Sequence, residues 1–510
     1  MSRISVILLV VASALEQGVA ATPREVVRVD SGGLQGVATG DVVSFKGIPY
    51  AAPPIGALRW RAPQPLASWA GLRSAKAFGN ACLQPPPRSA TFALRVPVSE
   101  DCLYLNIWRP AKSRGKLPVM LWIHGGSLVT GAASIARYDG AGLARRGVVM
   151  VSINYRLGYL GFFSHPALSR EAADVGRLAN YGLMDQVAAL YWVQQNIRAF
   201  GGDPSRVTIF GQSAGGLAVE ALLASPVARG LFHRAIVQSG YYRGPYPRIG
   251  EPAPDGRRSA EADGIEVLKS LGVATQDVSQ LRGLTSAQLL SLPPHGQSGA
   301  IPAIDGRYVV EDLWKTFREG REAAVPLIVG ATAQETPALP AAMRASARNL
   351  MAKFISPADE ARLLLGYGSP EAIDSRLSSD FTFAATMYSL ANLHLAQGHP
   401  TYRYRFAALP DAAAERLEGL PHSGDVPYVF GTLEAASWTM DARDRTISDA
   451  AMDYWVEFAR SGRPTPRGRP VWPSAAGEQI MLFDNDGAKP QLDDRAARYR
   501  ALAEIVDPRS

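Results

Sequence analysis

The pentapeptide Gly211-Gln212-Ser213-Ala214-Gly215 is the feature that most narrows what this chain of 510 residues can fold into. It directly follows the apolar segment RVTIF (residues 206–210) and precedes a helical stretch over residues 216–223. In this context a Gly-x-Ser-x-Gly sequence predicts a sharp strand-to-helix turn that presents the serine at the carboxyl end of a sheet. Side chains at the two flanking positions would clash with the neighbouring strand and helix, which explains the glycines. Ser213 is therefore the candidate nucleophile.

Short apolar runs alternate with helical patterns along most of the chain. Apolar runs of strand length occur at residues 117–123, 147–153, 206–210, 235–238, 325–329 and 402–406. Residues 180–200 carry apolar side chains at the spacing of a long amphipathic helix. Apolar strands separated by helices predict an α/β fold, with a mainly parallel sheet covered by helices on both faces.

Three stretches interrupt this alternation. They are residues 241–324, residues 336–400 and the proline-rich residues 463–475. We interpret them as insertions at the loop ends of the sheet, so that residues 22–510 form one domain. The alternative is a second domain built from residues 241–400.

A serine hydroxyl is a weak nucleophile near neutral pH, and it needs a base that is oriented by an acid. In the α/β-hydrolase chain order the acid follows the serine and the histidine comes last. His422 is the candidate base, because it lies in a loop after the last predicted strand. The alternatives are His394, which lies in a helical pattern, and His399, which lies just before a strand.

The acid is expected at the end of a strand between the serine and the histidine. Glu335 follows the apolar run 325–329 and is the candidate. Its carboxylate would accept a hydrogen bond from the second nitrogen of the histidine. Asp305 and Asp425 are the alternatives, the first as part of a turn and the second as a partner close to the histidine.

Backbone amides that could bind a developing oxyanion are expected after the strand at 117–123. His124-Gly125-Gly126-Ser127 follows that strand. The amides of Gly126 and Ser127, together with that of Ala214, are the candidate oxyanion hole. His124 is expected to shape this loop and not to act as the base.

The amino terminus has the pattern of a secretory signal. A charged start is followed by an apolar run over residues 4–15 and by small residues near position 20, which predicts cleavage after a signal over residues 1–21. The alternatives are a buried helix or an uncleaved anchor. No other segment is apolar enough to predict a stable membrane span. An exported protein, periplasmic or secreted, is the expectation.

The chain has two cysteines, Cys82 and Cys102, twenty positions apart. In an oxidising compartment this pair predicts a disulfide, and two buried thiols are the alternative. No cluster of cysteine and histidine accompanies them, so no metal or other cofactor is predicted. The net charge of +7 is scattered, without a run of basic residues, and gives no indication of a nucleic-acid partner.

Further motifs occur in a fixed order along nearly the whole chain. They are residues 45–56 (FKGIPYAAPPIG), 58–61 (LRWR), 100–106 (EDCLYLN), 154–158 (NYRLG), 180–186 (NYGLMDQ), 200–204 (FGGDP) and 455–460 (WVEFAR), followed by Trp472-Pro473. With Gly211–Gly215 they make the chain similar to the type-B carboxylesterases, the α/β-hydrolases that include cholinesterases and bacterial carboxylesterases. The resemblance implies hydrolysis of small-molecule carboxylic esters without a cofactor.

The resemblance also implies roles for particular residues. It implies Ser213, Glu335 and His422 as nucleophile, acid and base, a disulfide between the two cysteines, an ion pair between Arg59 and Glu100, and a place for Ser239 behind the site. The chain departs from the usual family pattern at several positions, which are Gln212 in place of glutamate, Ser127 in place of a third glycine, residues 331–336 around the acid and Ser423-Gly424 after the histidine.

Two other functions share these features. Activity on amides or long-chain lipids would use the same triad. Some relatives on this scaffold are non-catalytic adhesion proteins, but these typically lack the nucleophile, which is present here. The walls of the substrate pocket are expected from residues 241–324 and 336–400, and no motif there indicates which ester is preferred.

Overall fold

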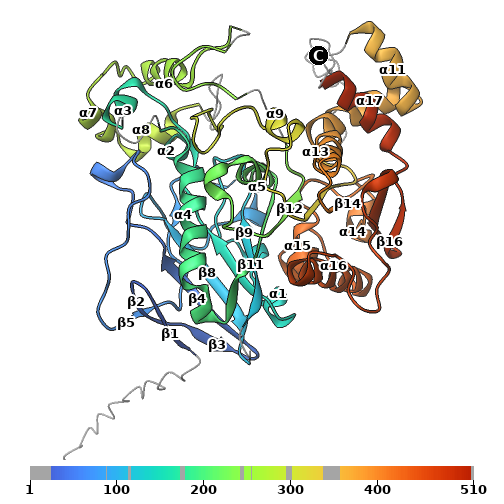
Figure 1. The fold of residues 1–510 in the computed structure, drawn as a ribbon, viewed down its shortest axis with the longest axis horizontal. Helices are drawn as coiled ribbons and strands as arrows, with labels where there is room; N and C mark the ends of the chain where they lie inside the picture. Colours follow the sequence, from blue (N-terminus) through green and yellow to red (C-terminus); the bar gives the residue numbers. More distant parts are fainter. Residues whose placement is uncertain are drawn as a thin grey trace, which may run out of the picture.

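An 11-stranded sheet forms the centre of the molecule (Figure 1). The order of its strands is β16 (Gly487–Leu492), β15 (Gln479–Asp484), β14 (Thr401–Phe406), β13 (Leu327–Thr332), β12 (Arg234–Gln238), β11 (Gly202–Gln212), β9 (Leu117–Ile123), β10 (Val149–Ile153), β8 (Tyr104–Pro110), β4 (Val42–Pro49) and β3 (Val37–Thr39). From β15 to β10 every neighbouring pair is parallel. The pairs outside this run, at both edges, are antiparallel. The predicted mainly parallel α/β sheet is confirmed.

The computed structural model describes residues 25–87, 89–112, 116–172, 178–241, 246–253, 256–293, 301–336 and 356–506. The predicted signal over residues 1–21 lies outside these described residues. Two small sheets lie beside the central one, with strands β1 (Val26–Val29), β2 (Gly32–Gln35) and β5 (Leu72–Ser74) in one, and β6 (Ala81–Cys82) and β7 (Val98–Ser99) in the other. None of the helices in the described ranges is both long and apolar enough to cross a bilayer.

Helices cover both faces of the sheet, because successive residues of each strand point to opposite faces. Leu121 and Ile123 of β9 belong to one buried cluster, and Met120 and Trp122 of the same strand belong to the other. The first cluster includes helices α4 (Tyr181–Asn196), α5 (Ala214–Ala224), α13 (Ala385–Ala396) and α17 (Ala496–Val506). The second includes α1 (Ala141–Arg145), α15 (Val426–Phe430) and α16 (Ala442–Ser461). Each fully buried aliphatic side chain contributes roughly 1.5–3 kcal/mol to this core.

Helix α4 differs from its prediction as an amphipathic helix over residues 180–200. It ends at Asn196 and continues as a 3-10 turn, Ile197–Phe200. Most of its residues are buried, on more than one side. Leu183 packs towards the sheet, while Met184 packs into a separate cluster with the segments that follow residue 158. The helix is therefore covered on its outer side as well, which a single-helix pattern does not reveal.

The remaining helices lie mostly in the stretches that interrupt the strand–helix alternation. Residues 241–324 contain α6 (Ala260–Lys269), α7 (Val278–Arg282), α8 (Ser286–Ser291) and α9 (Leu313–Arg318), and residues 336–400 contain α11 (Pro357–Tyr367), α12 (Pro370–Ser379) and α13. The other α-helices in the described residues are the short α2 (Gly158–Gly161), α3 (Pro166–Glu171) and α14 (Asp411–Ala414). Helix α13 packs on the central sheet, so the end of the second stretch is part of the sheet's own helical cover and not only an insertion.

Candidate active site

Ser213 occupies the turn between β11 and α5, as the sequence predicts. Its backbone has φ 59° and ψ −124°, a conformation that is strained for a residue with a side chain. Added Cβ atoms would lie 2.4 Å from the carbonyl oxygen of Gly215 at position 211, and 2.0 Å from that of Ile123 at position 215. Both flanking positions therefore require glycine. The Ser213 amide donates to the carbonyl of Gln238 on the adjacent strand at 2.9 Å, which holds the turn in place.

Glu335 is buried in the turn that follows β13, with 1% of its surface exposed. One carboxylate oxygen, Oε1, accepts hydrogen bonds from the Thr332 amide at 2.7 Å and from the Ser239 hydroxyl at 2.6 Å. The other oxygen, Oε2, lies 2.5 Å from Nδ1 of His422. The amide of His422 also donates to the Glu335 carbonyl at 3.1 Å. The structure thus brings the predicted acid and the predicted base into contact and fixes the carboxylate from behind.

The His422 imidazole lies between this carboxylate and the side chain of Gln212. Gln212 Nε2 lies 3.1 Å from His422 Nε2. Because Nδ1 faces the carboxylate and donates to it, Nε2 carries the lone pair and accepts from the Gln212 amide. No hydrogen bond joins Ser213 Oγ to the ring within the described residues. The ring also packs on Phe383, with centroids 4.5 Å apart.

Neither Gln212 nor Phe383 was predicted to contact the base. From the sequence, Gln212 stands out only as a departure from the family pattern at the position before the serine. Phe383 lies in a π-helical segment, Asp380–Ala384, between α12 and α13. Such segments are frequent at functional sites, but no sequence signal placed one here.

Asp305 is a turn residue and does not reach the histidine. One oxygen of its carboxylate accepts from the amides of residues 307–309 at 2.8 to 2.9 Å. The other accepts from the Asn180 side chain at 2.7 Å. The carboxylate therefore anchors its own turn to the start of α4.

Asp425 lies three residues after the histidine but bonds to other groups. Its Oδ2 accepts from the Gln238 amide at 2.9 Å and from the Tyr404 hydroxyl at 3.1 Å. Burial raises the pKa of the Asp425 carboxyl, and the nearby Glu335 raises it further. Asp425 therefore packs behind the contact between Glu335 and His422 and does not itself hydrogen-bond to the histidine ring.

The alternative bases, His394 and His399, lie elsewhere. The His394 ring contacts Glu322 Oε1 at 2.8 Å and the Val325 carbonyl at 2.9 Å. Its ring centroid is 4.7 Å from that of His399. Glu322 and His399 precede β13 and β14, so this group lies at the end of the strands opposite to Glu335.

The loop of Gly126 and Ser127 lies against the Ser213 turn. A Cβ added to the preceding Gly125 would lie 3.1 Å from the Ser213 Cβ. Gly126 and Ser127 both have positive φ, 110° and 57°, which explains why a third glycine is usual at the position that Ser127 occupies. Ala214 opens α5, where backbone amides have no partner within the helix. Across the described ranges, no hydrogen bond occupies the amides of Gly126, Ser127 or Ala214.

His124 shapes this loop. Its ring is fully buried, stacks on Tyr155 at 4.5 Å and lies with Nδ1 2.8 Å from the Gly125 carbonyl. Burial lowers the pKa of His124 to about 4, so the ring is neutral at physiological pH. A Cβ added at position 131 would lie only 2.4 Å from Nδ1 of His124, so this close approach of the loop to the ring requires glycine at position 131.

The Cys82–Cys102 pair forms a disulfide in the structure, and the chain has no other cysteine. Beside it, the Arg59 guanidinium makes two hydrogen bonds to the Glu100 carboxylate, at 2.8 and 2.5 Å. Both contacts tie the segment around residue 100 to the body of the protein.

Comparisons with known proteins find similar chains over nearly the whole length of this one. The model of the carboxylesterase family matches residues 23–360 and 370–500. Fumonisin B1 esterase of Sphingopyxis macrogoltabida is 37% identical over 489 residues, which cover 90% of this chain and 86% of that protein. Para-nitrobenzyl esterase of Bacillus subtilis (strain 168) is 32% identical over 489 residues, covering 91% and 95%. A solved structure of PNB esterase superimposes with a TM-score of 0.81 at 30% identity, covering 94% of this chain and 99% of that chain.

Proposed function

Because this chain belongs to the carboxylesterase family and is a carboxylic ester hydrolase, we propose that Ser213, His422 and Glu335 form its catalytic triad. The single observation that carries the proposal is the contact of 2.5 Å between Glu335 Oε2 and His422 Nδ1, made next to the serine turn. A buried carboxylate in this position selects the tautomer with its proton on Nδ1, and it stabilises the imidazolium that forms when the ring takes a second proton.

The first step is acyl transfer to the enzyme. The Ser213 hydroxyl attacks the carbonyl carbon of the ester, and its proton moves to His422 Nε2. The carbonyl oxygen becomes an oxyanion, which the amides of Gly126, Ser127 and Ala214 bind. His422 then gives the proton to the leaving alcohol, and the acyl group stays on the serine.

Water completes the reaction by the same route. His422 takes a proton from the water, the hydroxide attacks the acyl carbon, and the Ser213 oxygen leaves with the proton. Each oxyanion donor is expected to supply about 3 kcal/mol of transition-state stabilisation.

The side chain of Gln212 has to move away from the His422 ring before the first step. Its amide occupies the lone pair of His422 Nε2, and that lone pair is the acceptor for the proton of Ser213. We expect the serine hydroxyl to replace the amide when substrate binds. Catalytic hydrogen bonds often become short only in the complex with substrate.

A fluorophosphonate probe tests the nucleophile. The probe is expected to label the native enzyme on the peptide that contains Ser213, and the Ser213→Ala variant should lose both labelling and activity. Ser225→Ala is the matched control, because Ser225 is another buried serine and lies at the opposite end of α5. Full turnover by Ser213→Ala, or labelling of a different residue, would contradict the proposal.

A substrate panel separates ester hydrolysis from the related activities. We expect short-chain p-nitrophenyl esters to be cleaved with higher kcat/KM than long-chain esters or a matched anilide. Preference for the anilide would indicate an amidase, and preference for the long chains a lipase. A folded protein without any turnover or labelling would indicate a binding protein on this scaffold.

We also propose export, with removal of residues 1–21. The proposal rests on the sequence pattern of those residues and is supported by the disulfide, which is typical of oxidising compartments. Sequencing of the amino terminus of protein from the periplasm and the medium tests it. An intact Met1 in both fractions would contradict cleavage.

A further inference from the structure

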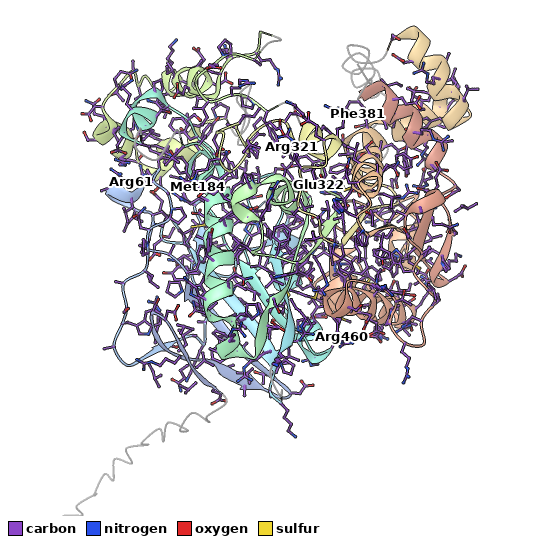
Figure 2. The ribbon with its side chains drawn as sticks, viewed as in Figure 1. Arg61, Met184, Arg321, Glu322, Phe381 and Arg460 are labelled. Atoms are coloured by element: carbon purple, nitrogen blue, oxygen red, sulfur yellow. A yellow bond between two sulfur atoms is a disulfide. The ribbon has the colours of Figure 1, made fainter. Side chains whose placement is uncertain are left out.

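A second group of ligand-type side chains lies far from the proposed triad. Glu322 precedes β13, His394 lies in the last turn of α13, and His399 precedes β14. Figure 2 labels Glu322 close to α13 and to the neighbouring Arg321. Strand β13 separates Glu322 from Glu335, and a strand of this length spans about 20 Å. The group is therefore independent of the reaction.

The contacts of His394 leave one ring nitrogen directed at a carboxylate. The ring is fully buried, and Nε2 lies 2.9 Å from the Val325 carbonyl, which only accepts hydrogen bonds. Nε2 must therefore carry a proton. In the neutral ring Nδ1 then has a lone pair, yet it lies 2.8 Å from Glu322 Oε1, which is also an acceptor. Two acceptors 2.8 Å apart have to share a cation, and at this distance a proton fits on the line between them. A metal ion can replace that proton once the two atoms move slightly apart.

Glu322 supplies the second observation. Its side chain has no exposed surface, and its other oxygen, Oε2, has no hydrogen-bond partner among the described residues. A buried carboxylate oxygen without a partner is costly. Its neighbour Arg321 does not compensate it, because that guanidinium is paired with Glu311 and Glu319.

His399 completes a set of three donors. Its Nε2 lies 3.9 Å from Glu322 Oε1, and the three ligand atoms lie within 4.8 Å of one another. Two imidazole nitrogens and one carboxylate are a donor set that zinc prefers, with bonds of about 2.0–2.2 Å and a water in the fourth position. The Val325 carbonyl holds the proton of the outer His394 nitrogen, as is usual for a histidine bound to a metal.

We propose that Glu322, His394 and His399 bind one structural Zn²⁺ ion. The ion would replace the proton shared by Nδ1 and Oε1, and these atoms would move from 2.8 Å to about 3.4 Å apart, as two tetrahedral zinc bonds require. It would neutralise the buried carboxylate and give Oε2 a role as a second ligand oxygen or as acceptor for the zinc-bound water. It would connect the loop before β13, the end of α13 and the start of β14. These are the two strands that support the loops of Glu335 and His422.

Zinc binding to the full-length, tag-free mature protein tests the proposal. Protein prepared free of metal with a chelator is expected to take up one Zn²⁺ per chain after gel filtration. Saturation with zinc should raise the melting temperature by about 3 °C. Co²⁺ in place of zinc should give the visible absorption of a tetrahedral site.

His399→Gln is the informative variant, because position 399 is the most exposed of the three and the fold should tolerate the change. Removing a partner of a metal ligand already costs about 10–100-fold in affinity, so loss of a ligand should weaken zinc binding by at least that much. His233→Gln is the matched control, since His233 is half-buried and lies outside the group. It should bind zinc like the parent protein.

Glu322→Gln provides a second variant of nearly equal size, and turnover of p-nitrophenyl butyrate shows that each protein is folded. Failure of the parent protein to bind zinc would overturn the proposal and leave His394 and Glu322 as a proton-linked pair. Binding by His399→Gln as tight as in the parent, or loss of binding in His233→Gln, would overturn it as well.

Discussion

The buried carboxyl of Glu220 leads to the sharpest prediction. Glu220 lies on α5, seven residues after Ser213, with 3% of its surface exposed, and its Oε1 has no hydrogen-bond partner among the described residues. Burial raises the pKa of Glu220 to about 8 from the ordinary 4.5. Replacing it by glutamine, which has the same shape and does not ionise, should stabilise the protein at neutral pH.

The magnitude follows from the difference between the folded and unfolded pKa. Below pH 4.5 the carboxyl is protonated in both states, and its ionisation has no effect on stability. As the pH rises from 4.5 to 8 the unfolded chain ionises while folded Glu220 stays protonated, so the free energy of unfolding falls by about 1.4 kcal/mol per pH unit. The loss amounts to about 3 kcal/mol at pH 7 and about 5 kcal/mol above pH 8.

Urea unfolding at pH 4.5, 7 and 8.5 measures this difference. Glu220→Gln should match the parent near pH 4.5 and exceed its free energy of unfolding by about 3 kcal/mol at pH 7. Glu220→Met, which removes both polar atoms, should show the same pH dependence as Glu220→Gln, because the effect comes from ionisation. A difference between parent and Glu220→Gln that stays constant with pH, or a parent that is more stable at pH 7, would refute the reasoning.

Three further perturbations test the surroundings of the site. Ser239→Ala removes a hydrogen bond to the Glu335 carboxylate, and a hydrogen bond to a charged group is worth about 1.5–3 kcal/mol. In this variant kcat/KM should fall about 10–100-fold with little change in KM. An unchanged kcat would argue that the Ser239 hydroxyl does not support the carboxylate. Gln212→Glu places a negative charge about 3 Å from the imidazole that it contacts and favours the protonated ring. In a pH–rate profile the variant should lose at least about tenfold in kcat/KM at pH 6 and recover at pH 9, whereas an equal loss at both values would contradict the electrostatic explanation. Replacing Cys82 and Cys102 together by serine opens a loop of about twenty residues and should lower the free energy of unfolding by about 3 kcal/mol. Calorimetry should find a lower melting temperature, with kcat retained. An unchanged melting temperature would exclude a stabilising role of the disulfide.

Much of the fold was predictable because each strand and each turn depends on a short run of residues. The apolar run at 117–123 became β9 with those bounds. The run at 325–329 was shifted, because β13 begins at Leu327 and continues to Thr332, and apolar character alone does not mark where pairing with the next strand starts. The prediction placed helix α4 correctly but was wrong about its outer surface. That surface is buried, because residues from elsewhere in the chain pack on it.

Some features of the candidate site also depend on a short run of residues, and others depend on contacts between distant segments. The strain at Ser213 and the clashes that require Gly211 and Gly215 arise within a few residues of backbone, so the pentapeptide alone determined this turn. The choice of Glu335 as the partner of His422 over Asp425 depends on contacts between segments 87 residues apart, which only the packing of the sheet brings together.

The sequence by itself therefore determined the strand–turn–helix around the serine, the glycine loop before it and the order of the candidate residues. These features depend on backbone sterics and on the spacing of apolar side chains, which are both set by residues close together in the chain. The tertiary structure alone decided that the Gln212 amide contacts Nε2 of His422, that Glu220 Oε1 is buried without a hydrogen-bond partner among the described residues, and that Glu322 lies close to two histidines. The physical reason is that desolvation and hydrogen bonding depend on which distant atoms come within about 3 Å, and that distance is set by how the helices pack on the sheet.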